Sequence, residues 1–184
     1  MRLKKLAALL AAMALAGVLA LSLTGCDKLP GVDAGVTGAS QASDGRQTGG
    51  YALGKIGEKL TTQFFTFSVN SVEKADSCGD AVPGEGNTLV VAEITVKNTF
   101  GETIPMFSSD FALGYGEGDE DYCFPLEAAG DGLMELQYDL AKGEEITAKV
   151  AYEVPADADS FSLFYLEIYE DDFVGNAYYV DFEL

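Results

Sequence analysis

The chain has 184 residues, of which 11 are Lys or Arg and 30 are Asp or Glu, so its formal charge is −19. A polyanion of this density is excluded as a nucleic-acid binder, because phosphate contacts need clustered Lys and Arg. The chain contains no His, which excludes a His general base and an imidazole metal ligand. A hydrophobic content of 48% with 22% charged residues indicates a globular protein rather than a disordered one.

The first 25 residues have the pattern of an export signal. Arg2, Lys4 and Lys5 precede Leu6–Leu23, a run of 18 residues that are almost all apolar or small. A basic segment followed by an apolar one is typical of a secretory signal peptide. The run is also just long enough to span a membrane, so an uncleaved transmembrane anchor is the alternative. Both interpretations place the remainder of the chain outside the cytoplasm, by the positive-inside rule.

The residues that follow favour lipid attachment. Leu23–Cys26 reads Leu-Thr-Gly-Cys, which resembles the bacterial lipobox, where small residues precede a Cys that is lipidated and becomes the mature N-terminus. The resemblance implies a diacylglycerol on Cys26, and stable membrane anchoring requires two acyl chains rather than one. Removal of residues 1–25 would leave a charge of −22, because three of the cationic residues precede Cys26 and all 30 acids follow it.

Residues 26–50 have the composition of a flexible tether. The 24 residues of Asp27–Gly50 include six Gly and no aromatic residue, and they are rich in Ser, Thr, Ala, Asp and Gln. A coil of this length has a root-mean-square span of about 25–30 Å, enough to hold a domain clear of lipid headgroups. Residues 51–184 are then a single domain of ordinary size, and they hold all 20 Phe and Tyr residues of the chain.

The predicted domain alternates apolar and polar residues, which is the pattern of half-buried antiparallel strands. Phe161–Tyr169 is apolar in both phases and predicts a strand covered on both faces. Gly and Pro separate the segments, and Asn98 can close a strand end with an Asx-type turn. We therefore predict an all-β fold, an immunoglobulin-like antiparallel β-sandwich of seven to nine strands after a signal peptide and flexible linker. The alternating segments are Phe65–Asn70, Val90–Lys97, Phe111–Tyr115, Ile146–Val154 and Tyr178–Glu183.

The order of these segments carries a family resemblance. The motifs are Gln63–Val72, Val90–Asn98 with its Val-Lys-Asn ending, Ser109–Phe111, Lys142–Glu144 and Val150–Pro155 with its Glu-Val-Pro ending. Together they resemble a large family of bacterial lipoproteins of unknown function, whose exported domain is immunoglobulin-like and similar to a secreted immunoprotective antigen. The resemblance spans the whole predicted domain. It implies the fold and the lipid-anchored location, and it assigns no catalytic residue.

Two cysteines remain if Cys26 is lipidated. Because the location outside the cytoplasm is oxidising, we predict a disulfide between Cys78 and Cys123, and two free thiols are the alternative. Such a bridge would close a loop of 45 residues, which the chain-entropy model values at about 4 kcal/mol. Redox catalysis is not expected, because the spacing is not Cys-x-x-Cys.

Acidic and aromatic residues supply further candidates. Glu117, Asp119 and Asp121 could present carboxylate oxygens to Ca²⁺, but their spacing does not fit an EF-hand, so a solvated loop is the preferred interpretation. No metal and no cofactor is therefore expected. Four tyrosines are candidates for a contact surface, although Tyr in strands more often packs within the sheet. They are Tyr165, Tyr169, Tyr178 and Tyr179.

The function we expect is that of a membrane-anchored, extracytoplasmic, non-catalytic binding module. Its partners would be the membrane, through the lipid, and an unknown envelope protein or glycan, with no nucleic acid. An envelope structural or accessory protein acting as an anchor or spacer is the alternative. A hydrolase is disfavoured, because a Ser nucleophile without His would need a Lys or a carboxylate as its base.

Overall fold

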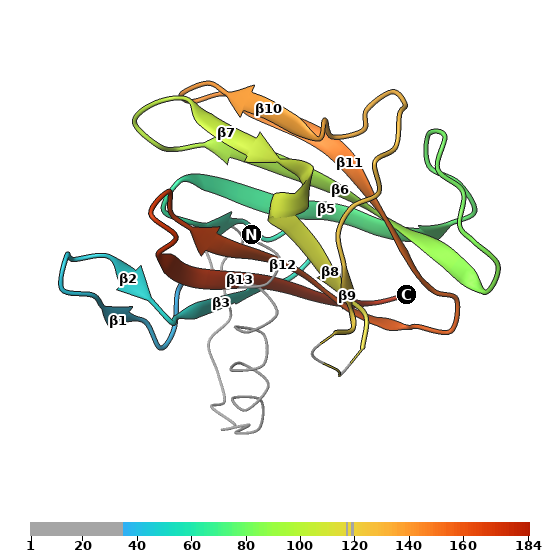
Figure 1. Cartoon of the computed structure of the whole chain (residues 1–184), viewed down its shortest axis with the longest axis horizontal. Helices are drawn as coiled ribbons and strands as arrows, with labels where there is room; N and C mark the ends of the chain where they lie inside the picture. The colour runs from blue at the N-terminus through green and yellow to red at the C-terminus, as the bar shows by residue number, and fades with distance from the viewer. Residues whose placement is uncertain (1–34, 117, 119) are drawn as a thin grey trace.

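The computed structural model describes residues 35–116, 118 and 120–184, which form two facing layers of β-strands (Figure 1). The predicted signal peptide, Cys26 and the first part of the predicted tether lie outside the described residues, as do Glu117 and Asp119. The described residues contain a single helical turn, the 3-10 helix η1 (Ser108–Asp110). No helix among them is long and apolar enough to cross a membrane.

The first layer is an antiparallel sheet built on two long strands. Its alternating residues give the strands one face toward the second layer and one face toward solvent. A two-stranded sheet of β7 (Ile104–Phe107) and β10 (Gln137–Leu140) continues this layer. The order of the main sheet is β11 (Glu145–Pro155), β6 (Asn87–Asn98), β5 (Phe65–Ala75) and β4 (Leu60–Thr61).

The second layer is a five-stranded sheet with β12 at its centre. The central place of β12 explains why its sequence is apolar in both phases, since Leu163 and Phe164 are only 0% and 6% exposed on opposite faces. The antiparallel prediction is confirmed for this sheet with one exception, because β3 runs parallel to β13. The order is β3 (Tyr51–Gly54), β13 (Val174–Glu183), β12 (Ser160–Ile168), β8 (Phe111–Gly114) and β9 (Tyr122–Cys123).

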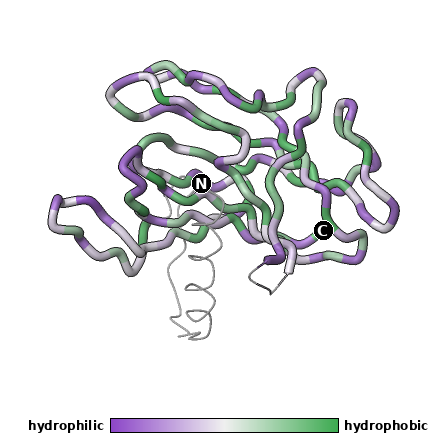
Figure 2. The backbone as a smooth tube through the Cα atoms, in the orientation of Figure 1, coloured by the Kyte–Doolittle hydropathy of each residue, from purple (hydrophilic) through white to green (hydrophobic). Residues whose placement is uncertain are grey.

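Large aromatic side chains fill the space between the sheets, and Figure 2 shows hydrophobic residues along the strands of both layers. Each such side chain stabilises the fold by about 1.5–3 kcal/mol through burial. Tyr152 is completely buried, and its hydroxyl donates a hydrogen bond to the Phe111 carbonyl oxygen at 3.1 Å. Tyr165 and Tyr178, predicted as candidates for a contact surface, belong to this core instead.

The second half of the predicted tether is folded. β1 (Ser40–Gln41) and β2 (Gln47–Thr48) form a hairpin that projects beside β3 in Figure 1. Gly50 is buried and donates its N–H to the Asn176 Oδ1 atom at 3.1 Å, in a space where a Cβ would lie 2.6 Å from Val36. The expectation of a flexible coil is therefore wrong for residues 35–50, because contacts with β13 fix this segment.

The predicted disulfide is not formed, because Cys78 and Cys123 are free thiols in the structure. Cys78 packs with Ala151 on the outer face of the first sheet, whereas Cys123 packs against the core between the sheets. The next residue of β11, Tyr152, points into that core, so the sheet itself separates the two thiols. Burial raises the pKa of the Cys123 thiol to about 12, which keeps it protonated and unreactive at neutral pH.

Candidate functional site

A groove of about 530 Å³ opens between β7, the beginning of β5 and the turn that joins β12 to β13. A volume of this size is within the range of small-ligand and peptide side-chain sites. Its lining combines aromatic rings, apolar side chains of β7 and carboxylates at the rim. This groove is the candidate functional site, and it is called the aromatic groove below.

The turn before β5 gives two neighbouring phenylalanines different degrees of burial. The buried Thr62 hydroxyl oxygen accepts hydrogen bonds from the N–H groups of Phe64 at 3.1 Å and Phe65 at 3.0 Å. The same hydroxyl donates to the Phe65 carbonyl at 2.8 Å, which fixes the chain as it enters the strand. Both side chains border the groove, but Phe65 is 2% exposed and packs in the core, whereas Phe64 is only half-buried.

Three aromatic side chains form one side of the groove. The Phe64 ring makes edge-to-face contacts with Phe100, at 5.5 Å between centroids, and with Tyr169, at 5.1 Å. All three rings are only half-buried. Edge-to-face pairs fix ring orientation, so the cluster is a preformed apolar surface rather than a set of independent side chains.

Asn98 sets the position of the groove wall that follows β6. Its side-chain N–H group donates to the carbonyl oxygens of Glu102 and Leu140, each at 2.8 Å, and its Oδ1 accepts the N–H of Phe100 at 2.8 Å. The last contact is the Asx-type turn that the sequence indicates. Because Asn98 is only 1% exposed, these bonds hold Phe100 and Glu102 firmly in place.

The only cation that lines the groove within the described residues is Arg46, from the β1–β2 hairpin. Its guanidinium donates two hydrogen bonds to the Asp171 carboxylate, at 2.8 and 2.9 Å, and one to Asp44 at 2.7 Å. The guanidinium carbon also lies 3.9 Å from the centroid of the Phe173 ring and 5.0 Å from that of Tyr169. These hydrogen bonds lower the pKa of both carboxyls and raise the pKa of Arg46, so all three groups stay charged.

The rim of the groove carries a net negative charge, because Arg46, the only cation in the described lining, pairs with Asp171, and further carboxylates line the groove. Glu102, Asp110 and Glu170 also line it. Asp110 Oδ2 accepts the N–H of Phe107 at 2.9 Å, and Glu102 and Glu170 are exposed. The groove therefore presents aromatic rings and negative charge together, a combination that attracts cations.

A buried carboxylate, Glu167, joins the segments that lead to the groove. Glu167 is 1% exposed and accepts hydrogen bonds from the N–H groups of Gln63 at 2.7 Å and Asn176 at 3.0 Å, and from the Tyr178 hydroxyl at 2.9 Å. The register of β12 shifts between Leu166 and Ile168, at the position of Glu167. Its contacts join β12, β13 and the turn before β5, so its role is structural.

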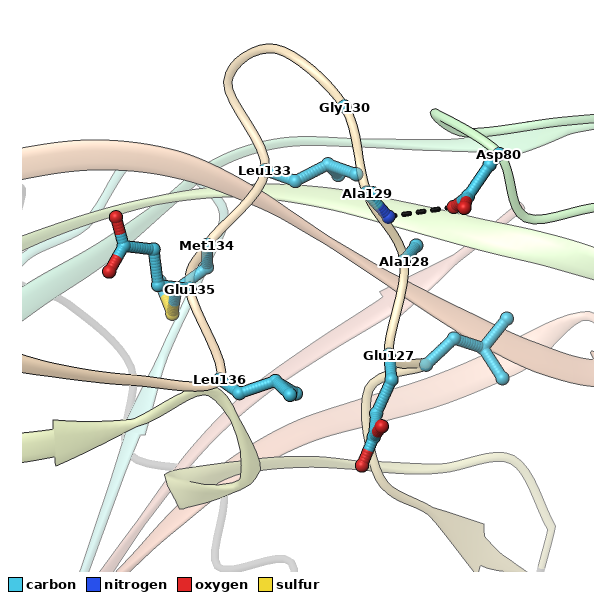
Figure 3. A pocket seen from close by; sticks show the side chains of 10 residues that line it. Asp80, Glu127, Ala128, Ala129, Gly130, Leu133, Met134, Glu135 and Leu136 are labelled. Atoms are coloured by element: carbon cyan, nitrogen blue, oxygen red, sulfur yellow. Dashed lines mark hydrogen bonds between the residues drawn. The ribbon is translucent and has the colours of Figure 1, made fainter.

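A second cavity, of about 380 Å³, lies within the loop that precedes β10 (Figure 3). Figure 3 shows two arms of this loop facing each other, with the Asp80 Oδ1 atom accepting the N–H of Ala129 at 2.7 Å. Gly79 has a φ of +60° and packs against the backbone of Ala129, where a Cβ on residue 79 would clash with the Ala129 carbonyl oxygen. The lining of this second cavity includes Leu133 and Met134 but no aromatic ring, so we favour the aromatic groove as the functional site.

The remaining predicted residues are distributed as follows. Of the weak Ca²⁺ candidates only Asp121 is described, and its Oδ2 closes a turn by accepting the N–H of Gly118 at 2.8 Å. Within the described ranges, no group of three His, Cys, Asp or Glu side chains is placed to hold a metal ion. Tyr169 lines the groove and the buried Tyr165 borders it, whereas Tyr179 lies on the outer face of the second sheet, next to Phe164 at 6.0 Å.

One nucleophile spacing was not recognised in the sequence. Ser71 and Lys74 have the spacing Ser-x-x-Lys on β5, but residues three apart in a strand point to opposite faces. The Lys74 Nζ atom donates instead to the Ala158 carbonyl oxygen at 2.7 Å. This pair is therefore not a nucleophile with its base.

Comparison with protein families identifies the domain. The sequence profile of DUF4352, a domain of unknown function, matches residues 54–176. The chain belongs to this family. The matched region of the DUF4352 domain includes Phe64, Phe100 and Tyr169 of the groove, but the Arg46 hairpin precedes it. No relative was found among curated protein sequences.

Solved structures share the fold. The yjhA protein of Bacillus subtilis is 20% identical over 69% of this chain and 99% of its own length, with a TM-score of 0.53. The Bacillus subtilis ycdA protein, named as a candidate lipoprotein, is 16% identical over 68% of this chain, with a TM-score of 0.52. This chain spans only 38% of the ycdA chain. At these identities the likeness shows a shared fold and nothing more.

Proposed function

We propose that the protein is a lipid-anchored, non-catalytic binding module on the extracytoplasmic side of a cell membrane, and that the aromatic groove is its binding site. The observation that carries the proposal is the set of half-exposed rings of Phe64, Phe100 and Tyr169, in which Phe64 contacts the other two edge to face, in a groove of about 530 Å³. A fold that needs these rings only for stability would bury them, as it buries Phe65.

Membrane anchoring rests on the Leu-Thr-Gly-Cys motif that ends at Cys26, and the likeness to ycdA supports it. It is tested in growing cells by comparing wild type with Cys26→Ser. The wild type is expected in the membrane fraction and the variant is expected as an unlipidated protein of altered mobility. Metabolic labelling with an alkyne fatty acid that marks both proteins equally would contradict the proposal.

Ligand binding is tested by a photo-cross-linking amino acid placed in the full chain in cells. Thr103 lines the groove and Thr61 lies on the edge strand β4, and both are exposed. A probe at Thr103 is expected to give a specific adduct that a probe at Thr61 does not give. Identical adducts, or none from Thr103, would sink the assignment of this groove.

The same pair of positions separates a binding module from an anchor or spacer. Thr103→Trp would fill the groove without disturbing the core, because the side chain is exposed, and Thr61→Trp is the matched control. In complementation of a gene deletion, a binding module loses function only with Thr103→Trp. A spacer tolerates both substitutions equally.

A further inference from the structure

The aromatic groove already contains one cation, Arg46, which the β1–β2 hairpin supplies. Arg46 belongs to the β1–β2 hairpin, yet its guanidinium lies over Phe173 and bonds to Asp171, which is 125 residues away in the sequence. The chain thus shows how a positive side chain on an extended segment is bound here, by an aromatic face and a carboxylate together.

The part of the groove beside Arg46 also combines aromatic rings with carboxylates, but no described cation lies there. Among the described residues, no Lys or Arg lies over the rings of Phe64 or Phe100, and Glu102 and Glu170 form no ion pair. Ring faces and carboxylates are thus available beside the site that Arg46 occupies. An isolated exposed carboxylate would mean little, but here the charge borders a preformed apolar surface.

The apolar side chains of β7 form a wall of the groove and indicate that a ligand would present an apolar group beside its cation. Ile104 and Met106 of β7 line the groove, together with Pro105. Pro105 has no N–H, which weakens this strand edge as a template for an added strand. Recognition therefore depends on side chains rather than on a ladder of main-chain hydrogen bonds. The groove volume of about 530 Å³ suits a short stretch of side chains rather than a whole folded surface.

We propose that the aromatic groove binds an extended segment of a partner protein that carries Lys or Arg beside an aromatic or aliphatic side chain. The proposal rests on the proposed function and adds the chemical class of the ligand. The cationic side chain lies between the aromatic cluster and the carboxylates of Glu102 and Glu170, and the apolar side chain packs on β7. The charge of −22 on residues 26–184 favours cationic partners at longer range and disfavours acidic glycans and anionic headgroups.

The test uses the tryptophan fluorescence of short peptides, because the protein contains no Trp. The probe is Ac-Gly-Lys-Trp-Lys-Gly-amide, titrated with the full chain in a non-ionic detergent. The neutral and acidic comparison peptides carry Gln or Glu in place of both Lys residues. We expect the Lys peptide to bind at least tenfold more tightly than the Gln peptide, with a blue shift in emission, and the Glu peptide to show no binding.

Variants distinguish the groove from the general negative field of the protein. Glu102→Gln with Glu170→Gln is expected to weaken the Lys peptide at least fivefold and to leave the Gln peptide unchanged. Glu85→Gln with Asp131→Asn is the matched control, since it removes two exposed carboxylates outside the groove lining. The control pair is expected to leave binding unchanged. Equal losses from both pairs would overturn the proposal, because they would mean unspecific attraction.

A neutral glycan, tested with chitotetraose, is the competing ligand class. Binding of chitotetraose without binding of the Lys peptide would overturn the cationic ligand, while an adduct at Thr103 in cells would keep the groove as a binding site. Failure of the peptide, the sugar and the Thr103 adduct together would overturn both proposals.

Discussion

The aromatic side chains of the core and those of the groove come from neighbouring positions in the chain but differ in burial. Phe65, Phe67 and Phe111 pack at 5.4–6.1 Å between ring centroids and are at most 2% exposed. Phe64 and Phe100 make a contact of the same kind at 5.5 Å, but they are half-buried. The core rings are closed in by both sheets, whereas the groove rings have protein on one side only.

This difference in burial shows that the role of an aromatic residue here depends on whether its side chain lies between the two sheets or at the groove, and not on the residue type. Burial of the core rings has already lowered the free energy of the folded state. The groove rings keep apolar surface in water, so the same gain is available to a bound ligand. Substitutions in the two clusters should therefore affect two different measurements.

The largest expected effect is alkaline unfolding, because it acts on several core tyrosines at once. Burial, as the first cause, raises the pKa of Tyr152, Tyr165 and Tyr178 above the ordinary value of 10.0. The folded state thus favours their neutral form, and the stability they contribute is complete below pH 10 and is lost as the pH rises above it. Thermal unfolding followed by circular dichroism should give a Tm that falls steeply above pH 10. A constant Tm up to pH 12 would contradict this.

The comparison between the clusters is tested directly by truncating one ring of each. Phe67→Ala should lower the free energy of unfolding by about 3–5 kcal/mol, because it leaves a cavity in the core. Phe100→Ala should cost about 1 kcal/mol or less, because the ring is already partly in water. Urea unfolding measures both. Equal losses would mean that the groove rings belong to the core.

A smaller loss of stability is expected from the buried carboxylate of Glu167. Glu167→Gln replaces an oxygen that accepts from N–H and O–H donors with an NH₂ group that faces a donor. We expect the free energy of unfolding to fall by about 1–3 kcal/mol. Glu170→Gln is the control at an exposed position and should stay within about 0.5 kcal/mol of wild type. A neutral result for Glu167→Gln would show that its donors find other partners.

The smallest effect on stability is expected from the hairpin. Arg46→Ala removes exposed contacts to Asp171 and Asp44, which contribute little to global unfolding. It should instead speed hydrogen exchange of the amides around Gly45 to Thr48, whereas exchange in β6 stays unchanged. Arg46→Lys is the matched comparison, and it should restore only part of the protection, since Lys lacks the planar fork. Protection that survives Arg46→Ala would show that other contacts hold the hairpin.

The long strands could be predicted because their side chains alternate over many residues. The alternation of side chains in β5, β6 and β11 and the double apolar phase of β12 are visible in the sequence. Strands of two to four residues, such as β1, β2 and β7, are too short to show a period. Their place depends on partners far away in the chain.

The groove and the hairpin escaped prediction for that reason. A Gly-rich polar stretch is typical of a linker, and only the fold shows that Arg46 meets Asp171. Phe64 and Phe65 look alike in sequence, and the Thr62 turn separates them. The cysteines were expected to meet because they are the two that remain after Cys26, but the course of β9 and the turn after β5 places them on opposite faces of a sheet.

The docked hairpin also limits how far the domain can stand from a membrane. If Cys26 is the lipidated residue, Gly35, the first described residue, follows it by nine positions. Even fully extended, such a segment reaches only about 30 Å. The groove lies next to the hairpin, because Arg46 is part of its lining. A ligand of the groove would therefore bind close to the surface of the bilayer. In that layer a partner anchored in the same membrane has a high effective concentration, and weak contacts in the groove would suffice to hold it.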